Sequence, residues 1–244
     1  MNSDSMKCAA HATVSIVYAV AAGYALYLGV EMPKEFYKNE IFRVGRDYFW
    51  YLLCTWLGMI HHFYFGIYSA IDIIERVPPT KSLVKLVNNL HSLGSFILFS
   101  VVFPFAVMVS ILFWTIFLWD REKVYPNVVD EYLPFWLNHF MHTYPLPLAI
   151  FYMATTNQKL PSKTNTFLGL LVFMAVYLIF LIKHRLMTGQ WLYFVFNSST
   201  PTQTVLLMAF SLLGPFVFHF VGYKLQIVLN DATNSYLKKD TKVQ

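Results

Sequence analysis

Hydrophobic residues along the chain form six long stretches separated by short polar segments. The stretches cover residues 9–30, 48–74, 93–119, 133–155, 166–182 and 204–226, and a polar tail over residues 231–244 follows the last one. A helix that crosses the hydrocarbon core of a bilayer needs about 20 mostly apolar residues. The pattern therefore predicts an all-α integral membrane bundle of about six transmembrane helices, with residues 1–244 forming a single multi-pass membrane domain.

The composition agrees with a membrane location. The chain is 57% hydrophobic and only 13% charged, whereas soluble domains carry about 25% charged residues. The connecting segments are too short to build a separate soluble domain. The net charge of +5 is better explained by contact with anionic lipid headgroups than by nucleic acid, so we expect the bilayer as a partner and no nucleic acid.

The sequence leaves the particular membrane open. Lys and Arg are divided almost evenly between the two predicted sides, so the positive-inside rule favours cytoplasmic termini by a small margin only. We expect an integral protein of an endomembrane or of the plasma membrane. The oligomeric state stays open as well.

One polar cluster lies inside an apolar stretch, over the residues Trp136-Leu137-Asn138-His139-Phe140-Met141-His142-Thr143. Residues 133–155 contain no Lys, Arg, Asp or Glu. Polar groups at membrane depth are costly, so they tend to pack inward and to mark a site. His139 and His142 share one helical face, with Asn138 beside it. The structural alternative is a polar staple between helices.

A hydroxyl on a second stretch suggests a reaction. Thr55 and His142 are reached from the same side of the membrane and, at 1.5 Å rise per residue, lie roughly 12 and 15 Å deep. A hydroxyl beside an imidazole is the minimal set for acyl transfer, because the imidazole accepts the proton as the oxygen attacks. Asn138 and His139 are candidates to orient the base or to donate to the oxyanion. Alternatively, Thr55 bonds to a carbonyl of its own helix.

A carboxylate that orients the histidine is not evident within these stretches. Asp72 lies roughly 25 Å along the helix from Thr55. An orienting group must therefore come from a loop, with Asp47, Asp120 and Glu122 as the options, or be an amide.

Metal binding is the competing chemistry, because imidazole is a common metal ligand. The histidines in apolar stretches, however, form only one HxxH and one HH pattern, with Asp72 as the only acidic residue on either stretch. The histidines within the apolar stretches are His61, His62, His139, His142 and His219. We expect no metal and no cofactor. A metal-dependent lipid oxidoreductase remains an alternative, and it would contain bound iron or another metal.

Some function classes lack their signatures. The chain has no phosphate-cradling glycine loop, no G-x-S-x-G motif and no string of charges within the apolar stretches. These absences weigh against an ATPase, a serine hydrolase of the common soluble fold and a proton-coupled transporter.

Several motifs together resemble a known family. Residues 120–126 read DREKVYP, residues 136–143 read WLNHFMHT, and Leu146-Pro147 follow. This pattern resembles the androgen-induced protein family, which includes androgen-dependent tissue factor pathway inhibitor-regulating proteins. Further matches extend the resemblance over all but the tail, at Glu31-Met32-Pro33, Gly66-Ile67 and Thr188-Gly189-x-Trp191. The resemblance implies a multi-pass membrane hydrolase that cleaves fatty acid esters of hydroxy fatty acids with a threonine nucleophile and a histidine.

The resemblance assigns the histidine to a single position, whereas the position of the threonine depends on how the sequence is aligned. His142 is the second histidine of the NHxMH pattern, whereas Thr55 matches the local pattern around the family threonine. Counting back from Gly66-Ile67 without a gap lands on Cys54, and counting forward from Gly45 lands on Tyr51. An acidic residue that often stands three after the family threonine is Gly58 here.

We predict Thr55 as nucleophile and His142 as general base of a lipid ester hydrolase, with Asn138 and His139 in support. The main alternative is a non-enzymatic multi-pass membrane regulator or scaffold.

Overall fold

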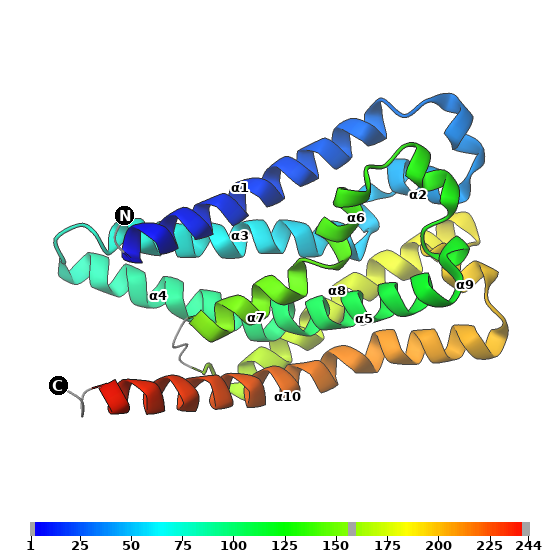
Figure 1. The fold of residues 1–244 in the computed structure, drawn as a ribbon. Helices are drawn as coiled ribbons and strands as arrows, with labels where there is room; N and C mark the ends of the chain where they lie inside the picture. Colours follow the sequence, from blue (N-terminus) through cyan, green and yellow to red (C-terminus); the bar gives the residue numbers. More distant parts are fainter. Residues whose placement is uncertain (1–2, 156–159, 241–244) are drawn as a thin grey trace.

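The computed structural model describes residues 3–155 and 160–240, with the side chains of residues 5–154 and 160–232. Every regular element in these residues is a helix, as predicted (Figure 1). The α-helices are α1 (Ser3–Val30), α2 (Glu40–Asp47), α3 (Leu53–Ile74), α4 (Lys81–Ile97), α5 (Phe103–Asp120), α6 (Phe135–His142), α7 (Pro145–Thr155), α8 (Lys163–Thr188), α9 (Phe194–Ser198) and α10 (Pro201–Asp240).

Four helical segments are long and apolar enough to cross a membrane. They are Ser5–Val30, Lys81–Lys123, Lys163–Thr188 and Pro201–Ala232. The stretch at 48–74 yields α3, which carries two adjacent histidines and Asp72, and the stretch at 133–155 is split into two short helices. The chain is therefore a multi-pass helical membrane protein, and the predicted count of six crossings is not confirmed.

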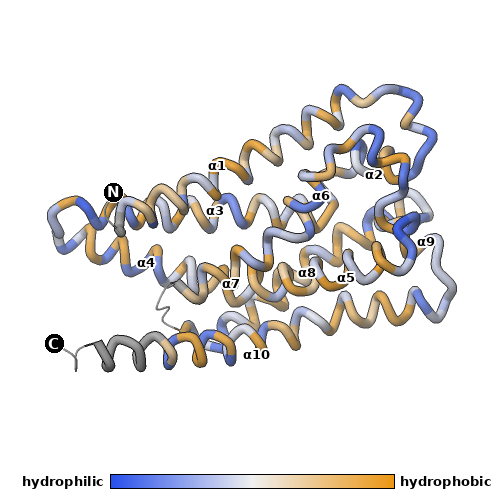
Figure 2. Tube along the Cα trace, viewed as in Figure 1, coloured by the Kyte–Doolittle hydropathy of each residue, from blue (hydrophilic) through white to orange (hydrophobic). Residues whose placement is uncertain are grey.

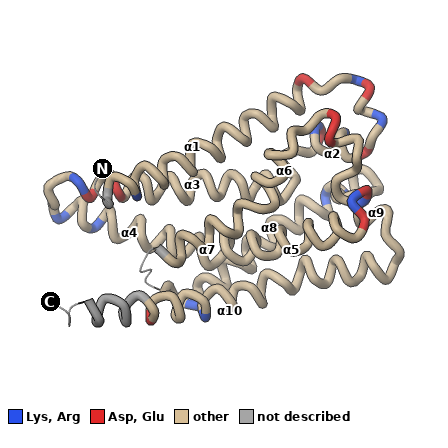
Figure 3. The backbone as a smooth tube through the Cα atoms, in the orientation of Figure 1, with Lys and Arg blue, Asp and Glu red and all other residues tan. Residues whose placement is uncertain are grey.

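The distribution of charge and hydropathy along the bundle also indicates that its middle lies in lipid. Lys, Arg, Asp and Glu gather at the two ends of the bundle, and its middle is free of them (Figure 3). Hydrophobic residues dominate the same middle band (Figure 2). Val20, Val172 and Val228 on α1, α8 and α10 are each 63% exposed. A soluble monomer seldom exposes so much apolar surface, so these faces contact lipid.

The stretch predicted at 93–119 belongs to a longer helical segment. Thr80 caps α4 by accepting a hydrogen bond from the N–H of Leu83 at 3.2 Å. A π-helical turn at Leu98–Val102 joins α4 to α5. Pro104 is the second residue after this turn, and because it has no N–H, it favours the irregular turn over a regular helical hydrogen-bond pattern. Some 78% of the most apolar part of this segment is buried, against 22% in the other three candidate spans, so α5 lies at the centre.

The helix predicted from residue 48 begins at Leu53. A 3₁₀ turn at Phe49–Tyr51 precedes it, and the N–H of Leu53 donates to the hydroxyl of Tyr193 at 2.9 Å. Thr55 thus lies in the first turn of α3. The predicted depth of Thr55 assumed a continuous helix from residue 48 and is wrong in that respect.

The stretch predicted as one helix at 133–155 breaks after His142. The N–H groups of Thr143 and Tyr144 both donate to the carbonyl of His139, at 2.8 and 3.0 Å. Pro145 begins α7, where its missing N–H costs nothing. His142 therefore ends a helix of eight residues, and its predicted depth, which assumed a continuous span, changes too.

The last two helices extend beyond their predicted bounds. Gly189, with a φ of +75°, ends α8 and donates its N–H to the carbonyl of Arg185. This left-handed conformation suits glycine. The helix α10 continues to Asp240, so residues 231–240 of the predicted polar tail are helical. Residues 241–244 lie outside the described residues.

Two clusters of buried side chains hold the helices together. The first joins α3, the α4–α5 segment, α7 and α10, and includes Tyr64, Phe99, Phe103, Met153 and Tyr223. The second joins α3, α5 and α8, and includes Leu57, Phe105, Met108, Leu170 and Tyr177. Dense packing of this kind fixes helix positions. The second cluster places the first turn of α3 against α5, and the hydroxyl of Ser110 on α5 holds the end of α6 through the carbonyl of His142.

Candidate active site

The imidazole of His142 is held in one orientation by its own helix. Its Nδ1 lies 2.8 Å from Oδ1 of Asn138 and 3.1 Å from the carbonyl oxygen of Asn138. Both oxygens only accept hydrogen bonds, so Nδ1 carries the hydrogen in the neutral ring. The lone pair then lies on Nε2. This is the tautomer that a general base requires.

The central helix α5 supports His142 from the side. The ring of Phe113 stacks on the imidazole, with 3.8 Å between centroids and 9° between planes. The hydroxyl of Ser110 donates to the backbone carbonyl of His142 at 2.7 Å. A side chain and a backbone contact thus fix both ends of this residue, which limits its rotation.

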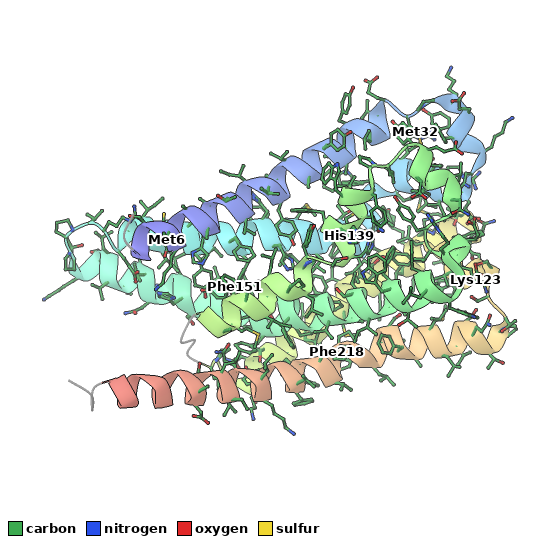
Figure 4. The ribbon with its side chains drawn as sticks, in the orientation of Figure 1. Met6, Met32, Lys123, His139, Phe151 and Phe218 are labelled. Atoms are coloured by element: carbon green, nitrogen blue, oxygen red, sulfur yellow. The ribbon has the colours of Figure 1, made fainter. Side chains whose placement is uncertain are left out.

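Asn138, and not His139, contacts the candidate base. Asn138 is 1% exposed, and its Nδ2 has no hydrogen-bond partner among the described residues. His139 is a half-buried residue of α6 (Figure 4), and its Nδ1 is 2.9 Å from the hydroxyl of Thr143. Trp114 donates to the same hydroxyl at 3.1 Å. His139 therefore belongs to a neighbouring network.

Three of the four carboxylates considered from the sequence have partners other than His142. Asp72 lies 2.6 Å from Nδ1 of His11. Glu122 accepts from the N–H of Asn127 at 3.1 Å. Asp47 pairs with Arg46 at 2.9 Å, and the hydrogen bond from Arg46 lowers the pKa of the Asp47 carboxyl. The group that contacts His142 is an amide, which was one of the two options.

A large apolar cavity adjoins His142. Its volume is about 530 Å³, within the range of small-molecule sites. Helices α1, α2, α3, α5, α6, α8, α9 and α10 all contribute to its wall. Tyr125 also lines it, and burial raises the pKa of Tyr125 to about 12, so this phenol is neutral. The cavity suits an acyl chain with few polar atoms.

Thr55 lines a second and smaller cavity of about 40 Å³. Among the described residues, no hydrogen bond joins Thr55 to His142 or to a carbonyl of its own helix. Thr55 lies too close to the start of α3 to bond to a carbonyl of that helix, because the residue four positions before it lies in the 3₁₀ turn. The bond to a carbonyl of its own helix, which was the alternative for Thr55, is therefore not present among the described residues, and Thr55 lines this small cavity.

The two cavities are neighbours. Five residues line both of them: Ala25, Phe49, Cys54, Leu137 and Met141. Cys54 thus shares the large cavity with His142, whereas Thr55 does not line that cavity. Successive residues of a helix point about 100° apart, which is why adjacent residues face different spaces. The sequence had left these two positions as alternatives.

Tyr18 of α1 is a site residue that the sequence did not indicate. It lines the small cavity, is 2% exposed, and its hydroxyl has no hydrogen-bond partner among the described residues. Its ring contacts His61 at 5.1 Å and Phe140 at 4.6 Å. Nothing in the pattern of α1 separates Tyr18 from an ordinary core residue, because α1 and α3 are adjacent only in three dimensions.

Another hydroxyl–imidazole pair lies away from both cavities. The hydroxyl of Thr166 is 3.0 Å from Nε2 of His219 and 2.7 Å from the hydroxyl of Tyr223. Thr166 and His219 are each 0% exposed. The pair lines neither of the two cavities, and it joins α8 to α10.

The histidines considered as metal ligands are dispersed. His61 contacts the carbonyl of Leu57 at 2.8 Å, and His62 contacts the carbonyl of Ser15 at 2.9 Å. Within residues 3–155 and 160–240, no group of three or more His, Cys, Asp or Glu side chains is placed to hold a metal ion. The histidines thus have separate protein partners.

Comparison with known proteins identifies the family. A model of the FAR-17a/AIG1-like protein family matches residues 7–227. The androgen-dependent TFPI-regulating protein of Mus musculus is 30% identical over 193 residues, 78% of this chain and 81% of that protein. That of Mesocricetus auratus is 31% identical over 216 residues, 87% of each chain. The androgen-induced gene 1 protein of Homo sapiens is 31% identical over 138 residues, 55% of this chain and 58% of that protein.

No solved structure matches the chain at a significant level. The matched residues 7–227 include the DREKVYP and WLNHFMHT motifs as well as the first turn of α3. The resemblance indicated by the motifs is thereby confirmed, and the chain belongs to the FAR-17a/AIG1-like protein family.

Proposed function

We propose that the protein is a membrane-embedded hydrolase that cleaves the ester bond of fatty acid esters of hydroxy fatty acids. The observation that carries this proposal is the state of His142. Asn138 holds its Nδ1–H, its Nε2 has no hydrogen-bond partner in the described part of the chain, and the ring lines a large apolar cavity within a membrane bundle. A base at the wall of an acyl-sized cavity is the arrangement that a lipid ester hydrolase needs.

Thr55 is the proposed nucleophile. Its hydroxyl oxygen attacks the ester carbonyl while Nε2 of His142 takes the proton, which forms a tetrahedral oxyanion. Collapse of this intermediate breaks the bond to the hydroxy fatty acid, and His142 returns the proton to that leaving oxygen. The fatty acyl group remains on Thr55. The shared walls at Leu137 and Met141 support an ester that lies where the two cavities meet.

Water completes the cycle. Nε2 of His142 takes a proton from a water molecule, whose oxygen attacks the acyl carbonyl and releases a fatty acid, and Thr55 recovers its proton. The small cavity beside Thr55, about 40 Å³, is large enough for a water molecule. The unpartnered hydroxyl of Tyr18 would bind it, and the unpartnered Nδ2 of Asn138 is a donor for the oxyanion.

Cys54 is a second candidate nucleophile, because it lines the large cavity together with His142. Four variants separate the two residues: Thr55→Ala, Cys54→Ala, His142→Ala and Cys54→Ser. Membranes containing each are incubated with a fluorophosphonate probe and with a branched fatty acyl ester. We expect labelling and hydrolysis to be lost in Thr55→Ala and His142→Ala and kept in Cys54→Ala. Loss in Cys54→Ala and retention in Thr55→Ala would move the nucleophile to Cys54.

A non-enzymatic regulator is the second candidate function, and it is favoured by the name of the TFPI-regulating relatives. Under that reading, Thr55→Ala and His142→Ala leave the regulatory effect unchanged in cells. Normal expression of the wild type, with neither labelling nor hydrolysis, would support the regulator and contradict the hydrolase.

A further inference from the structure

The large cavity has one charged residue in its wall. Among the described residues that line it, Lys123 is the only Lys, Arg, Asp or Glu. All other parts of the wall are apolar or neutral, including the face with His142. A cation at one point of an apolar cavity distinguishes one end of a long ligand from the other.

The charge of Lys123 is not neutralised by the protein. Its neighbours in the DREK segment have partners: Arg121 pairs with Asp130 at 2.8 Å, and Glu122 accepts from the N–H of Asn127. No acidic side chain lies in ion-pair distance of Lys123 among the described residues. An unpaired ammonium at a low-dielectric wall favours an anionic ligand group.

Lys123 lies at the end of the bundle, close to α9 (Figure 4). Its Nζ is 4.9 Å from the ring centre of Trp119, a side chain that is 56% exposed. Lys123 therefore connects the cavity to the surface, at the end where other charges gather (Figure 3). A ligand held there places its charged group near the surface and its chain inside.

We propose that Lys123 binds the free carboxylate of the lipid substrate and thereby selects esters that carry an acid group. This inference rests on the proposed function, because it identifies the residue with which the same site recognises its substrate. The carboxylate accepts hydrogen bonds from the Lys123 ammonium, and the acyl chains extend along the apolar wall toward His142. A neutral ester of equal length lacks this contact.

The test measures binding and does not require turnover. Purified protein in nanodiscs of phosphatidylcholine, carrying His142→Ala, is titrated with a fluorescent long-chain fatty acid and with the methyl ester of that acid. We expect the acid to bind about tenfold more tightly than the ester. Lys123→Met is expected to remove this difference, and Lys123→Arg to keep it.

Lys85→Met serves as the matched control. Lys85 is exposed on α4 and lines neither cavity, so its loss is expected to leave the preference for the acid unchanged. Equal weakening of acid and methyl ester by Lys123→Met would make Lys123 a structural residue and overturn the proposal. So would equal binding of both ligands to the parent protein.

Two further arms separate related outcomes. Competition by phosphatidic acid that is stronger than competition by the fatty acid would assign Lys123 to a phosphate headgroup and overturn the carboxylate reading. If the wild type hydrolyses no ester but still prefers the acid through Lys123, the proposed function fails and the carboxylate site stands. The two failures are therefore distinguishable.

Discussion

The side-chain oxygen of Asn138 lies 2.8 Å from Nδ1 of His142, one helical turn further along α6. This contact selects the ring tautomer in the same way that a carboxylate does in other hydroxyl–imidazole sites. Here an uncharged amide performs that role, so no buried negative charge is needed within the membrane.

Replacing Asn138 by leucine removes this acceptor and is expected to lower kcat/KM for ester hydrolysis by about 10- to 100-fold. The remaining backbone carbonyl at 3.1 Å retains part of the orientation. Asn138→Asp keeps an acceptor and is expected to lose less. Both are measured with a fatty acid ester of a hydroxy fatty acid after the folded fraction is matched by size-exclusion chromatography. Full activity of folded Asn138→Leu would remove Asn138 from the mechanism.

Replacing Tyr18 by phenylalanine deletes a buried hydroxyl that has no protein partner in the described part of the chain. Removing an unsatisfied group costs little or stabilises, so the melting temperature is expected to stay level or rise. If this hydroxyl holds the water, deacylation slows about tenfold while acylation is unchanged. A burst-phase assay separates the two steps. A melting temperature that drops sharply would instead show that the hydroxyl has a structural partner.

Replacing Thr166 by valine should produce the opposite behaviour. The change leaves Nε2 of His219 and the hydroxyl of Tyr223 without the oxygen that contacts them at 3.0 and 2.7 Å. We expect a loss of about 1–3 kcal/mol of stability. Hydrolysis per folded molecule is expected to be unchanged, because this pair lines neither cavity. Thermal unfolding measures the loss of stability, and kcat normalised to the folded fraction measures hydrolysis. A loss of kcat without a loss of stability would instead indicate that the pair between α8 and α10 takes part in the reaction.

The pair of Arg46 and Asp47 predicts a pH dependence of stability. Arg46 lowers the pKa of the Asp47 carboxyl below its ordinary value of 3.8. A lowered folded-state pKa gives stabilisation above pH 3.8 that is lost as the pH falls through the folded-state pKa. Both side chains are in contact with solvent, at 29% and 37% exposure, so the effect is small and weakens with salt. The melting temperatures of wild type and Asp47→Asn should differ at pH 6 in low salt and converge well below pH 3.8. A constant difference would mean that Asp47 acts through packing.

The hydropathy of the chain predicted the all-helical membrane fold but not the ends of its helices. Hydropathy reports which residues prefer lipid, whereas a helix ends where backbone hydrogen bonds stop. At His142 the end is set by Pro145, which donates no hydrogen bond. At Leu53 it coincides with a hydrogen bond to Tyr193, 140 residues away. The first cause is visible in the sequence, and the second is not.

The candidate site was predictable in part for the same reason. The polar cluster at Asn138 and His142 stands out because it interrupts an apolar stretch, and one helical turn brings the two together. The choice between Cys54 and Thr55 depends on the rotation of α3, which packing against α1, α5 and α6 determines. Tyr18 and Lys123 join the cavities through tertiary contacts alone. Neither residue type by itself indicates that the side chain lines a cavity.

The hydrogen bond between the N–H of Leu53 and the hydroxyl of Tyr193 also determines how small a working version of this protein can be. Cys54 and Thr55 follow Leu53 directly, and Tyr193 itself lies 2.5 Å from the hydroxyl of Tyr177 on α8. A fragment that ended after α7 would contain Thr55, Asn138 and His142 and still lack the groups that fix the start of α3. The minimal unit of this enzyme candidate therefore extends at least to Tyr193, the residue before α9.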